Sequence, residues 1–313
     1  MTTGGFVHDA LLFASDDELV AVTVAFLDAG LDADESAVVV TTERVTALLR
    51  DALGGDSRVR FASGGEIYGR PPQALLAYRE LVEQEVGAGA RRVRAVCELP
   101  FGDNPTDWLE WVRVDAVLNH AIASYPVWGV CLYDTRQLPG EVLAAAELTH
   151  PHLRMGTSRA ASPRYLDPAE FLRQLPDPGP DPLEATVPTV AVDDVRDLRR
   201  LRQRLNAAVV GSTLPTWTTG EFVFAASEIA TNAIRHGRPP VRVRMWVTPN
   251  RLLCTVTDSG PGVDDPLAGY VPAHRDPARG GLGLWLARRL CDHIDLRRTP
   301  EGFTVCLKTG TWP

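Results

Sequence analysis

The chain has 313 residues and a mass of 34.1 kDa, with 45% hydrophobic and 23% charged residues. This size allows two domains, and the balance is that of a globular protein, which excludes a disordered regulator and a fibrous protein. No apolar stretch reaches the roughly 18–20 residues of a membrane span, and the acidic N-terminal region does not resemble a signal peptide, so we expect a cytoplasmic protein with no membrane partner.

Charge and cysteine content narrow the choice of partners. Residues 1–186 contain 15 arginines, no lysine and 28 acidic residues, whereas residues 187–313 contain 17 basic and 12 acidic residues. Two halves of opposite sign indicate two domains with different partners. The positive excess of the second half favours an anionic ligand but is too small to predict direct nucleic-acid binding. The five cysteines form no Cys-x-x-Cys pair, so neither a disulfide framework nor a zinc site is predicted.

The first part of the chain, residues 5–174, alternates between apolar β-rich runs and helical patterns. Strands are predicted at Asp9–Ala14, Ala37–Thr42, Arg58–Ala62, Arg92–Leu99 and Val127–Asp134. Helices are predicted near 16–29, 43–53, 71–87, 105–123 and 139–148. This alternation predicts an α/β domain with a mostly parallel sheet and helices on both faces. Residues 175–188 contain five prolines among acidic residues, which predicts an extended linker.

Beyond the linker, residues 189–313 show a different order of elements. A strand at Thr189–Val192 leads into an arginine-rich helix from Asp193, and a second helix is predicted over Thr218–His236. The remaining elements are strands at Val241–Val247 and Leu252–Asp258, a helix from Leu282, and strands at Asp295–Arg298 and Gly302–Lys308. The pattern predicts an α/β sandwich with helices on one face of a mixed sheet.

Three motifs in this second domain can carry chemistry. Glu228 and Asn232 lie four residues apart in a helical pattern, so they share one helix face. An amide oxygen is a suitable ligand for Mg²⁺ and a carboxylate can act as a base, although a solvated polar stripe gives the same spacing. In T-V-T-D-S-G-P-G, Asp258 ends a strand and Gly260 and Gly262 allow close backbone approach to a ligand. That carboxylate can accept a hydrogen bond from an amino group.

The third motif is the glycine-rich segment 279–284, which contains Gly281 and Gly283 and leads into the helix L-W-L-A-R-R-L. Backbone N–H groups at a helix N-terminus bind phosphate, although such a segment can also be a plain connection between packed elements. Between the second and third motifs, Val263–Arg279 has no strong periodicity and many Pro, Asp and Gly residues, which favours a lid over a bound nucleotide.

In their order and context, the three motifs resemble the Bergerat ATP-binding fold of histidine kinases, gyrase-type ATPases and anti-sigma factor serine kinases. The resemblance implies ATP and Mg²⁺ as cofactors, with Asn232 as the Mg²⁺ ligand and Glu228 as the catalytic base. It implies that Asp258 recognises adenine and that Thr304 supports the adenine side of the site. It further implies a lid and phosphate cradle shaped by four glycines, Gly260, Gly262, Gly281 and Gly283.

The type of kinase is inferred from what the sequence lacks. No histidine lies between His152 and His236, so the helix before the ATP site offers no phosphoacceptor, and the chain shows no transducer domain after it. The domain therefore resembles the anti-sigma factor serine/threonine kinases. Two alternatives stay open: a regulator that binds partners in an ATP-dependent way without catalysis, and a histidine kinase-like sensor that uses His8 or His150.

The first domain contains no P-loop motif. The strings F-V-H-D-A-L-L-F-A-S-D-D-E-L, C-E-L-P, V-L-N-H-A-I-A, V-C-L-Y-D and E-L-T-H-P-H-L resemble the MEDS sensory domain, which is similar to a RecA-like core without its Walker A loop. Val114-Asp115 depart in part from the aromatic–acidic pair common in that family. Polar residues predicted near sheet ends, as a ligand site or as structural caps, are His8, Glu98, Asn119, Tyr133 and Asp134.

The two halves together resemble the RsbA-type anti-sigma regulators of actinobacteria. The resemblance implies a kinase that phosphorylates an anti-sigma factor antagonist, sequesters a sigma factor and is gated by its sensory domain, which would receive a small molecule or a protein signal. A homodimer is left open.

Overall fold

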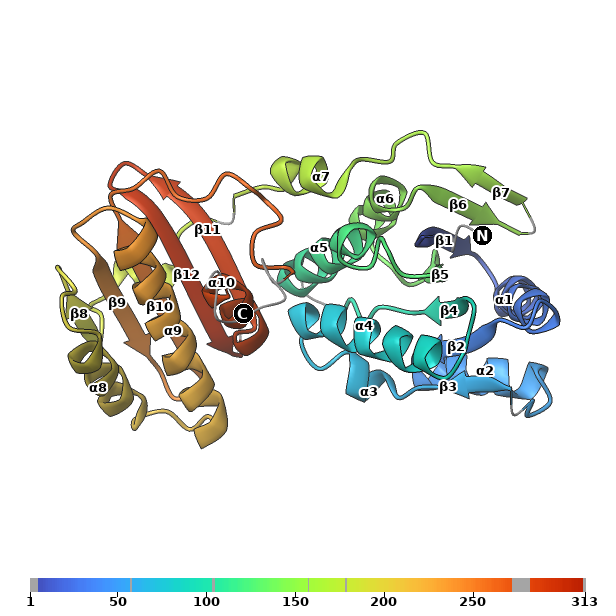
Figure 1. Cartoon of the computed structure of the whole chain (residues 1–313), viewed down its shortest axis with the longest axis horizontal. Helices are drawn as coiled ribbons and strands as arrows, with labels where there is room; N and C mark the ends of the chain where they lie inside the picture. Colours follow the sequence, from blue (N-terminus) through green and yellow to red (C-terminus); the bar gives the residue numbers. More distant parts are fainter. Residues whose placement is uncertain are drawn as a thin grey trace. The chain divides into compact units, whose positions relative to one another are not determined.

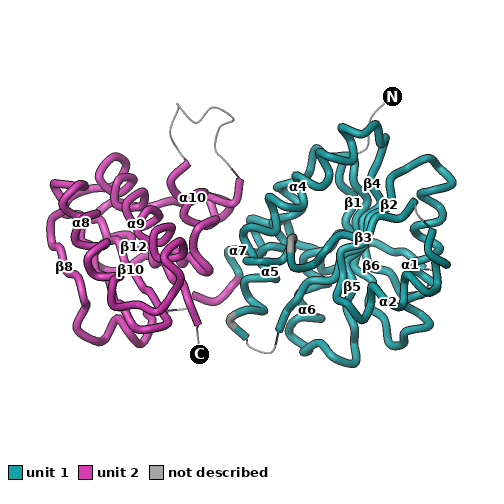
Figure 2. The backbone as a smooth tube through the Cα atoms, turned by 90° about the horizontal axis from the view of Figure 1, so that it is seen from below, with its two compact units in different colours: residues 1–174 teal, residues 175–313 magenta. Residues whose placement is uncertain are grey.

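The computed structural model describes residues 5–56, 58–102, 105–156, 158–177, 179–271 and 282–311. The chain forms two units, residues 1–174 and residues 175–313, which Figure 2 shows in teal and magenta. No helix in this described part of the chain is both long and apolar enough to cross a membrane.

The N-terminal unit is built on one seven-stranded sheet (Figure 1). Its strands are β1 (Val7–Phe13), β2 (Ser36–Val40), β3 (Val59–Phe61), β4 (Val93–Cys97), β5 (Val127–Asp134), β6 (His152–Met155) and β7 (Ser158–Ala161). They lie in the order β3-β2-β4-β5-β1-β6-β7, and every neighbouring pair is parallel except β6 and β7. The predicted α/β class with a mostly parallel sheet is therefore confirmed.

Helices cover both faces of this sheet. They are α1 (Asp16–Asp32), α2 (Glu43–Ala52), α3 (Gly64–Ile67), α4 (Pro71–Gly87), α5 (Pro105–Ala121), α6 (Gly140–Thr149) and α7 (Pro168–Gln174). On one face, Leu11 and Leu132 pack with side chains of α1 and α2. On the other face, the alternation of strand side chains directs Tyr133 toward α5, where its hydroxyl donates to Asp115.

The hairpin of β6 and β7 is absent from the sequence prediction. All four residues of β7 are exposed, and β6 has no buried residue. Strands without a buried face leave no apolar alternation to recognise, which explains the omission.

The C-terminal unit contains one five-stranded sheet with three helices on one face (Figure 1). Its elements are β8 (Val190–Val192), α8 (Leu198–Val209), α9 (Thr216–His236), β9 (Arg242–Val247), β10 (Arg251–Asp258), α10 (Gly283–Leu290), β11 (His293–Thr299) and β12 (Gly302–Gly310). The strand order is β11-β12-β10-β9-β8, and all neighbouring pairs are antiparallel, where a mixed sheet was predicted. The α/β sandwich itself is confirmed.

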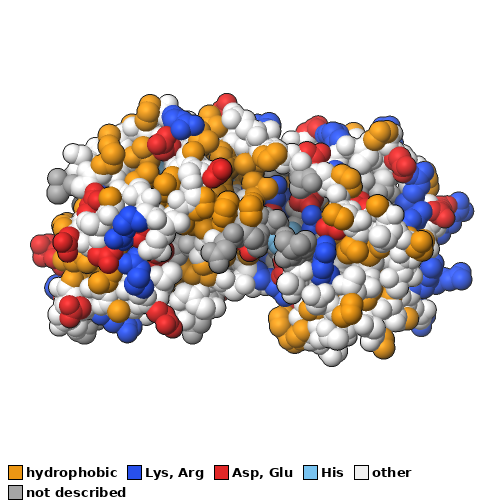
Figure 3. All heavy atoms as spheres, turned by 180° about the vertical axis from the view of Figure 1, so that it is seen from behind, with side chains coloured by type: hydrophobic (Ala, Val, Ile, Leu, Met, Phe, Trp, Pro, Cys, Tyr) orange, Lys and Arg blue, Asp and Glu red, His pale blue; other side chains and the backbone are white. Residues whose placement is uncertain are grey.

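Helix α8 carries much of the positive charge of this unit. Its sequence L-R-R-L-R-Q-R-L places Leu201 and Leu205 in the core, while its four arginines are exposed. Figure 3 shows Lys and Arg side chains gathered at the edge of the unit to which α8 belongs.

Part of the predicted linker folds onto the C-terminal sheet. Residues Pro182–Ala185 form a 3-10 turn whose capping box is made by Asp181 and Glu184. The Glu184 carboxylate accepts hydrogen bonds of 2.8 Å from Arg297, and Leu183 packs beside Trp246. The predicted linker is therefore not extended over its whole length, since Asp181 and Glu184 pair with Arg251 and Arg297 of the sheet, on the face opposite the helices.

Candidate functional site

Glu228 and Asn232 lie on α9, the longest helix of the C-terminal unit, with one turn between them. Neither side chain forms a hydrogen bond or ion pair with any described residue, although both are only partly exposed. Polar groups at such depth normally have partners, because an unmade hydrogen bond costs roughly 1–3 kcal/mol. Two adjacent ones without a partner indicate a place where a ligand supplies the bonds.

Asp258 is the last residue of β10 and is buried, with 7% of its surface exposed. Its Oδ1 accepts hydrogen bonds from the backbone N–H groups of Gly260 at 2.7 Å and Arg238 at 3.1 Å. Its Oδ2 accepts none from the described residues. The backbone therefore fixes the carboxylate by one oxygen and leaves the other free.

A cavity of about 220 Å³ is bordered by Asn232 and Asp258 but not by Glu228. Asn232 and Asp258 line it together with His236 at the end of α9. Its apolar walls are Ile229, Ala233, Val256, Val263, Leu284, Leu296, Phe303 and Val305. Apolar walls with one carboxylate suit a flat, largely apolar ring that carries an amino group.

Two glycines are required by the packing around this cavity. A Cβ at Gly262, where φ is +74°, would lie 2.1 Å from the ring of Phe303. A Cβ at Gly283 would lie 2.4 Å from Asn232 Nδ2. Gly283 opens α10, whose N-cap residue Leu282 provides no side-chain cap, so backbone N–H groups of its first turn lie beside Asn232. This arrangement can receive phosphate groups.

Gly237, which the sequence analysis did not select, has the same function as Gly260 beside the carboxylate. A Cβ would lie 2.3 Å from Asp258 Cγ at Gly237 and 2.6 Å from Asp258 Oδ1 at Gly260. The sequence signal that could have identified Gly237 is its position directly after the predicted helix that ends at His236. Gly281 and most of the predicted lid, residues 272–279, lie outside the described residues.

Thr304 does not line the cavity, contrary to the expectation drawn from the sequence. Its neighbours Phe303 and Val305 do, and side chains alternate along β12, so Thr304 lies on the opposite face of the sheet. There its Oγ1 lies 2.8 Å from Thr257 Oγ1 of the paired strand. Thr304 does lie on a late strand, as predicted, but its side chain points away from the cavity.

In the N-terminal unit, Glu98 follows β4 at the carboxyl edge of the sheet and borders a hollow of about 580 Å³. Its Oε2 accepts hydrogen bonds from the backbone N–H of Thr42 at 2.9 Å and from its hydroxyl at 2.6 Å. Its Oε1 accepts none from the described residues. Arg50, Ser63 and Gly64 also line the hollow, which is therefore able to hold a small polar molecule.

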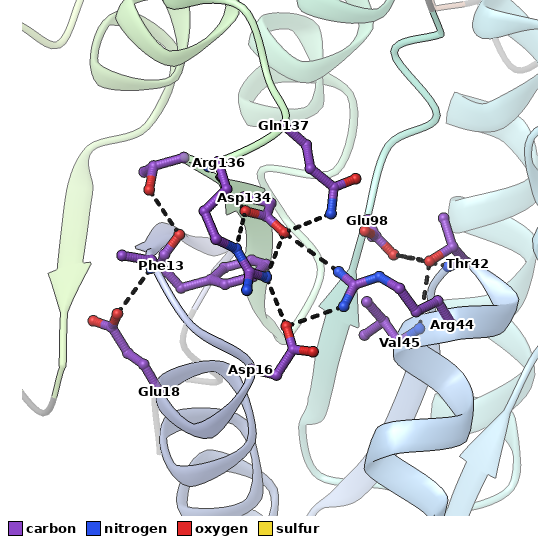
Figure 4. A network of polar contacts seen from close by, with 12 residues as sticks. Phe13, Asp16, Glu18, Thr42, Arg44, Val45, Glu98, Asp134, Arg136 and Gln137 are labelled. Atoms are coloured by element: carbon purple, nitrogen blue, oxygen red, sulfur yellow. Dashed lines mark hydrogen bonds and ion pairs between the residues drawn. The ribbon is translucent and has the colours of Figure 1, made fainter.

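Asp134, by contrast, is fully engaged (Figure 4). Its carboxylate accepts bonds from Arg136 at 2.7 and 2.9 Å and from Gln137 at 3.0 Å, and it pairs with Arg44. Hydrogen bonds from Arg136 hold its pKa below the usual value. The same two arginines pair with Asp16 at the start of α1. This network ties the end of β5 to α1 and α2 and leaves no acceptor for a ligand.

The other three predicted residues, His8, Asn119 and Tyr133, come together in a buried group. His8 Nδ1 lies 3.2 Å from Asn119 Oδ1, and the Tyr133 hydroxyl donates to Asp115 Oδ2 at 2.7 Å. Of the other members of this group, sequence reasoning did not select Asp115 and Cys131 as site residues, and it named His150 only as an alternative phosphoacceptor.

Comparison with protein families agrees with the division of the chain. Residues 7–151 match the MEDS family, described as "MEthanogen/methylotroph, DcmR Sensory domain". Residues 191–309 match the histidine kinase-like ATPase domain. The chain joins a MEDS domain to a histidine kinase-like ATPase domain. The cavity between α9, α10 and β10 lies within the ATPase domain, and the hollow beside Glu98 lies within the MEDS domain.

Among solved structures, similarity is found to the flagellar accessory protein FlaH from Methanocaldococcus jannaschii. The identity is 11%, the TM-score is 0.24, and the alignment covers 50% of this chain and 75% of FlaH. That likeness is too distant to transfer a function. No curated protein matches the sequence.

Proposed function

We propose that the chain is an ATP- and Mg²⁺-dependent protein serine/threonine kinase of the anti-sigma factor type. It would phosphorylate a serine or threonine of an anti-sigma antagonist and sequester a sigma factor, and its MEDS domain would gate this activity. The observation that carries the proposal is a group of polar side chains on or beside one cavity of the ATPase domain, Glu228, Asn232 and Asp258, each of which has an acceptor atom with no partner among the described residues.

The adenine end of the site is supported by Asp258. Its Oδ2 is free, and the apolar walls of Ile229, Val256 and Phe303 offer contact to both faces of a ring. An amino group that donates to Oδ2 would satisfy the only unpaired acceptor of this buried carboxylate. Adenine supplies such an amine, whereas guanine presents a carbonyl oxygen at the same place and would meet a repulsive contact.

The phosphate end is supported by Asn232 and the N-terminus of α10, which meet at Gly283. The Asn232 side-chain oxygen is unpaired and is a hard neutral donor of the kind that Mg²⁺ accepts, so this residue fits the ion and would hold it. Mg²⁺ neutralises phosphate charge and keeps the transferred group in line with its acceptor. The α10 amides would hold the phosphate oxygens.

Glu228 is the group placed to handle the proton. The hydroxyl oxygen of the partner would attack the γ-phosphorus while the bond to the ADP oxygen breaks, and the hydroxyl proton would pass to the Glu228 carboxylate. That carboxylate has no partner in the described part of the chain and lies one helical turn from Asn232.

Transfer through a histidine of this chain is disfavoured by burial. The two candidate acceptors, His8 and His150, are exposed by only 1% and 0%, and α8 contains no histidine. Because neither of these histidines is accessible and α8 offers none, a phosphoacceptor on another protein is favoured. A non-catalytic regulator is the second candidate, since Glu228 does not line the cavity.

The MEDS domain would sense a small polar molecule in the hollow beside Glu98. The free Glu98 Oε1, the guanidinium of Arg50 and the hydroxyl of Ser63 offer an acceptor, a cation and a donor. These groups lie at the carboxyl edge of a parallel sheet, where α/β domains commonly bind ligands.

The test is phosphoryl transfer from radiolabelled ATP with Mg²⁺ to candidate antagonist proteins. We expect acid-stable label on a serine or threonine of an antagonist, reduced at least ~100-fold by Asn232→Ala and by Glu228→Gln. Asn206→Ala, an exposed asparagine on α8, is the matched control and should retain full transfer. Acid-labile label on the chain itself would contradict the proposal, and regulation that survives Glu228→Gln would favour the non-catalytic alternative.

A further inference from the structure

Four side chains that can bind a metal meet inside the MEDS domain. His8 on β1, Asp115 on α5, Cys131 on β5 and His150 after α6 place one ligand atom each within 4.8 Å of one another. All four residues are at least 95% buried. The pairing of Ala10 with Cys131 puts His8 and Cys131 on the same face of the sheet, the face that α5 and α6 cover.

The distances between the ligand atoms suit a tetrahedral ion. His8 Nε2 lies 3.2 Å from Cys131 Sγ and 3.6 Å from Asp115 Oδ1, and His150 Nε2 lies 3.6 Å from the same Oδ1. Zinc binds nitrogen, oxygen and sulfur at about 2.0–2.3 Å, which places neighbouring ligands of a tetrahedron roughly 3.3–3.7 Å apart. Three of the six distances between ligand atoms are therefore close to those of a tetrahedral zinc site, and the other three are at most 4.8 Å.

The surrounding hydrogen bonds orient both histidine rings. Asn119 Nδ2 donates to the backbone oxygen of Thr149 at 2.7 Å, so Asn119 Oδ1 is left as the acceptor for His8 Nδ1–H. His150 Nδ1 lies 3.0 Å from the backbone oxygen of Ala146, which can only accept. In both rings the proton is therefore on Nδ1, and the unprotonated Nε2 faces the centre.

Asp115 is oriented in the same way. Its Oδ2 accepts hydrogen bonds from the Tyr133 hydroxyl at 2.7 Å and from the Thr149 hydroxyl at 2.8 Å. Its Oδ1 and His150 Nε2 are buried and have no hydrogen-bond partner among the described residues. Two nitrogen lone pairs and a carboxylate oxygen thus converge on the Cys131 thiol, whose single proton can satisfy only one of them. A cation at the centre would satisfy all three.

From this geometry we infer that His8, Asp115, Cys131 and His150 bind one zinc ion. One thiolate and one carboxylate would balance the charge of Zn²⁺, so the buried centre would be neutral. Two imidazoles and a thiolate exclude Mg²⁺ and Ca²⁺, which prefer oxygen ligands, and suit a divalent transition metal. With four protein ligands the site is closed, as in structural zinc sites, and it would join β1, β5, α5 and α6.

The inference is independent of the kinase activity, and it is tested on the full chain without a histidine tag. Elemental analysis should find one zinc per chain, and replacement by Co²⁺ should give the absorption of a tetrahedral thiolate complex. Asp115→Asn keeps the shape of the side chain and should weaken zinc binding at least ~100-fold in a competition titration with a zinc indicator. Cys131→Ala should lose the thiolate-to-cobalt band.

Cys254→Ala is the matched control, because Cys254 is equally buried but lies in the other unit. It should retain one zinc per chain. Removal of zinc by a chelator should lower the melting temperature of the parent and of Cys254→Ala, and leave that of Asp115→Asn unchanged. A folded parent that takes up no zinc, or zinc that persists in both site variants, would overturn the assignment. Copper or iron in its place would also contradict it.

Discussion

Two buried carboxylates, Asp258 in the ATPase domain and Asp134 in the MEDS domain, differ in whether protein groups occupy both of their oxygens. In the ATPase domain, Asn232 and Asp258 line a cavity, and the Asn232 side chain and Asp258 Oδ2 have no partner among the described residues. In the MEDS domain, Asp134 has its carboxylate occupied by Arg136, Gln137 and Arg44, and Asp9 is held by two arginines. A free, partly buried acceptor therefore indicates a ligand, whereas a paired one indicates structure. Asp115 shows both arrangements in one carboxylate. Its Oδ1 has no hydrogen-bond partner among the described residues, and its Oδ2 accepts hydrogen bonds from Tyr133 and Thr149.

The largest effect is expected from a substitution that fills the cavity of the ATPase domain. In Gly262→Ala the new Cβ would need a positive φ and would collide with Phe303, so we expect nucleotide binding to be lost and the free energy of unfolding to fall by about 2 kcal/mol. Gly87→Ala, at the end of α4 with open space around its Cβ, is the control. Urea denaturation measures the free energy of unfolding, and an ATP titration measures nucleotide binding. A Gly262→Ala chain that binds ATP normally would contradict the close packing of Gly262 against Phe303.

The second test concerns the paired oxygen of Asp115. Tyr133→Phe removes one of its two hydrogen bonds inside the MEDS domain without changing the shape of the ring. We expect the free energy of unfolding to fall by about 1–2 kcal/mol, with no change in ATP affinity. Tyr165→Phe, in a less buried position, should be close to neutral. A Tyr133→Phe chain as stable as the parent would show that this bond is not needed.

A smaller effect is expected from pH through Asp134. Since its pKa is lower in the folded chain than its usual 3.8, the unfolded chain binds more protons in acid. The stabilisation is therefore complete above about pH 5 and is lost as pH falls through the folded pKa. Asp134→Asn should cost about 1 kcal/mol at neutral pH and less near pH 2. Denaturation curves at several pH values check this, and an equal cost at both ends would contradict it.

The smallest effect is predicted for Thr304. Because its side chain lies on the face away from the cavity, Thr304→Val should change ATP affinity less than twofold and cost about 0.5–1 kcal/mol through the lost contact with Thr257. A large loss of affinity would restore Thr304 to the site.

Local sequence patterns selected three residues that line the cavity of the ATPase domain, Asn232, Asp258 and Gly262, whereas Glu228 does not line it. Glu228 and Asn232 share a face because helices repeat every 3.6 residues, and Asp258 is followed by the glycines that let the backbone reach its carboxylate. The expectation for Thr304 was wrong because successive side chains along a strand point to opposite faces of the sheet. A difference of one residue is therefore enough to move a side chain away from the cavity.

The MEDS domain was less predictable because its contacts join distant residues. Asp134 resembled a ligand group until the fold brought Arg44 to it from 90 positions away. His8, Asp115, Cys131 and His150 follow no metal-binding spacing, and they meet because β1 pairs with β5 and because α5 and α6 bring Asp115 and His150 to the same place. The antiparallel hairpin of β6 and β7 left no hydrophobic pattern to detect.

The most direct test of the ATP site is calorimetric titration of ATP into the parent chain and into Asp258→Asn, with Asp194→Asn as an exposed control in the same domain. The amide side chain introduced by Asp258→Asn would keep an oxygen for the backbone N–H groups of Gly260 and Arg238 but would present its own amino group to the ligand. We predict binding by the parent and the control, and a loss of affinity of about 100-fold in Asp258→Asn. Equal affinity in all three chains would contradict the adenine site.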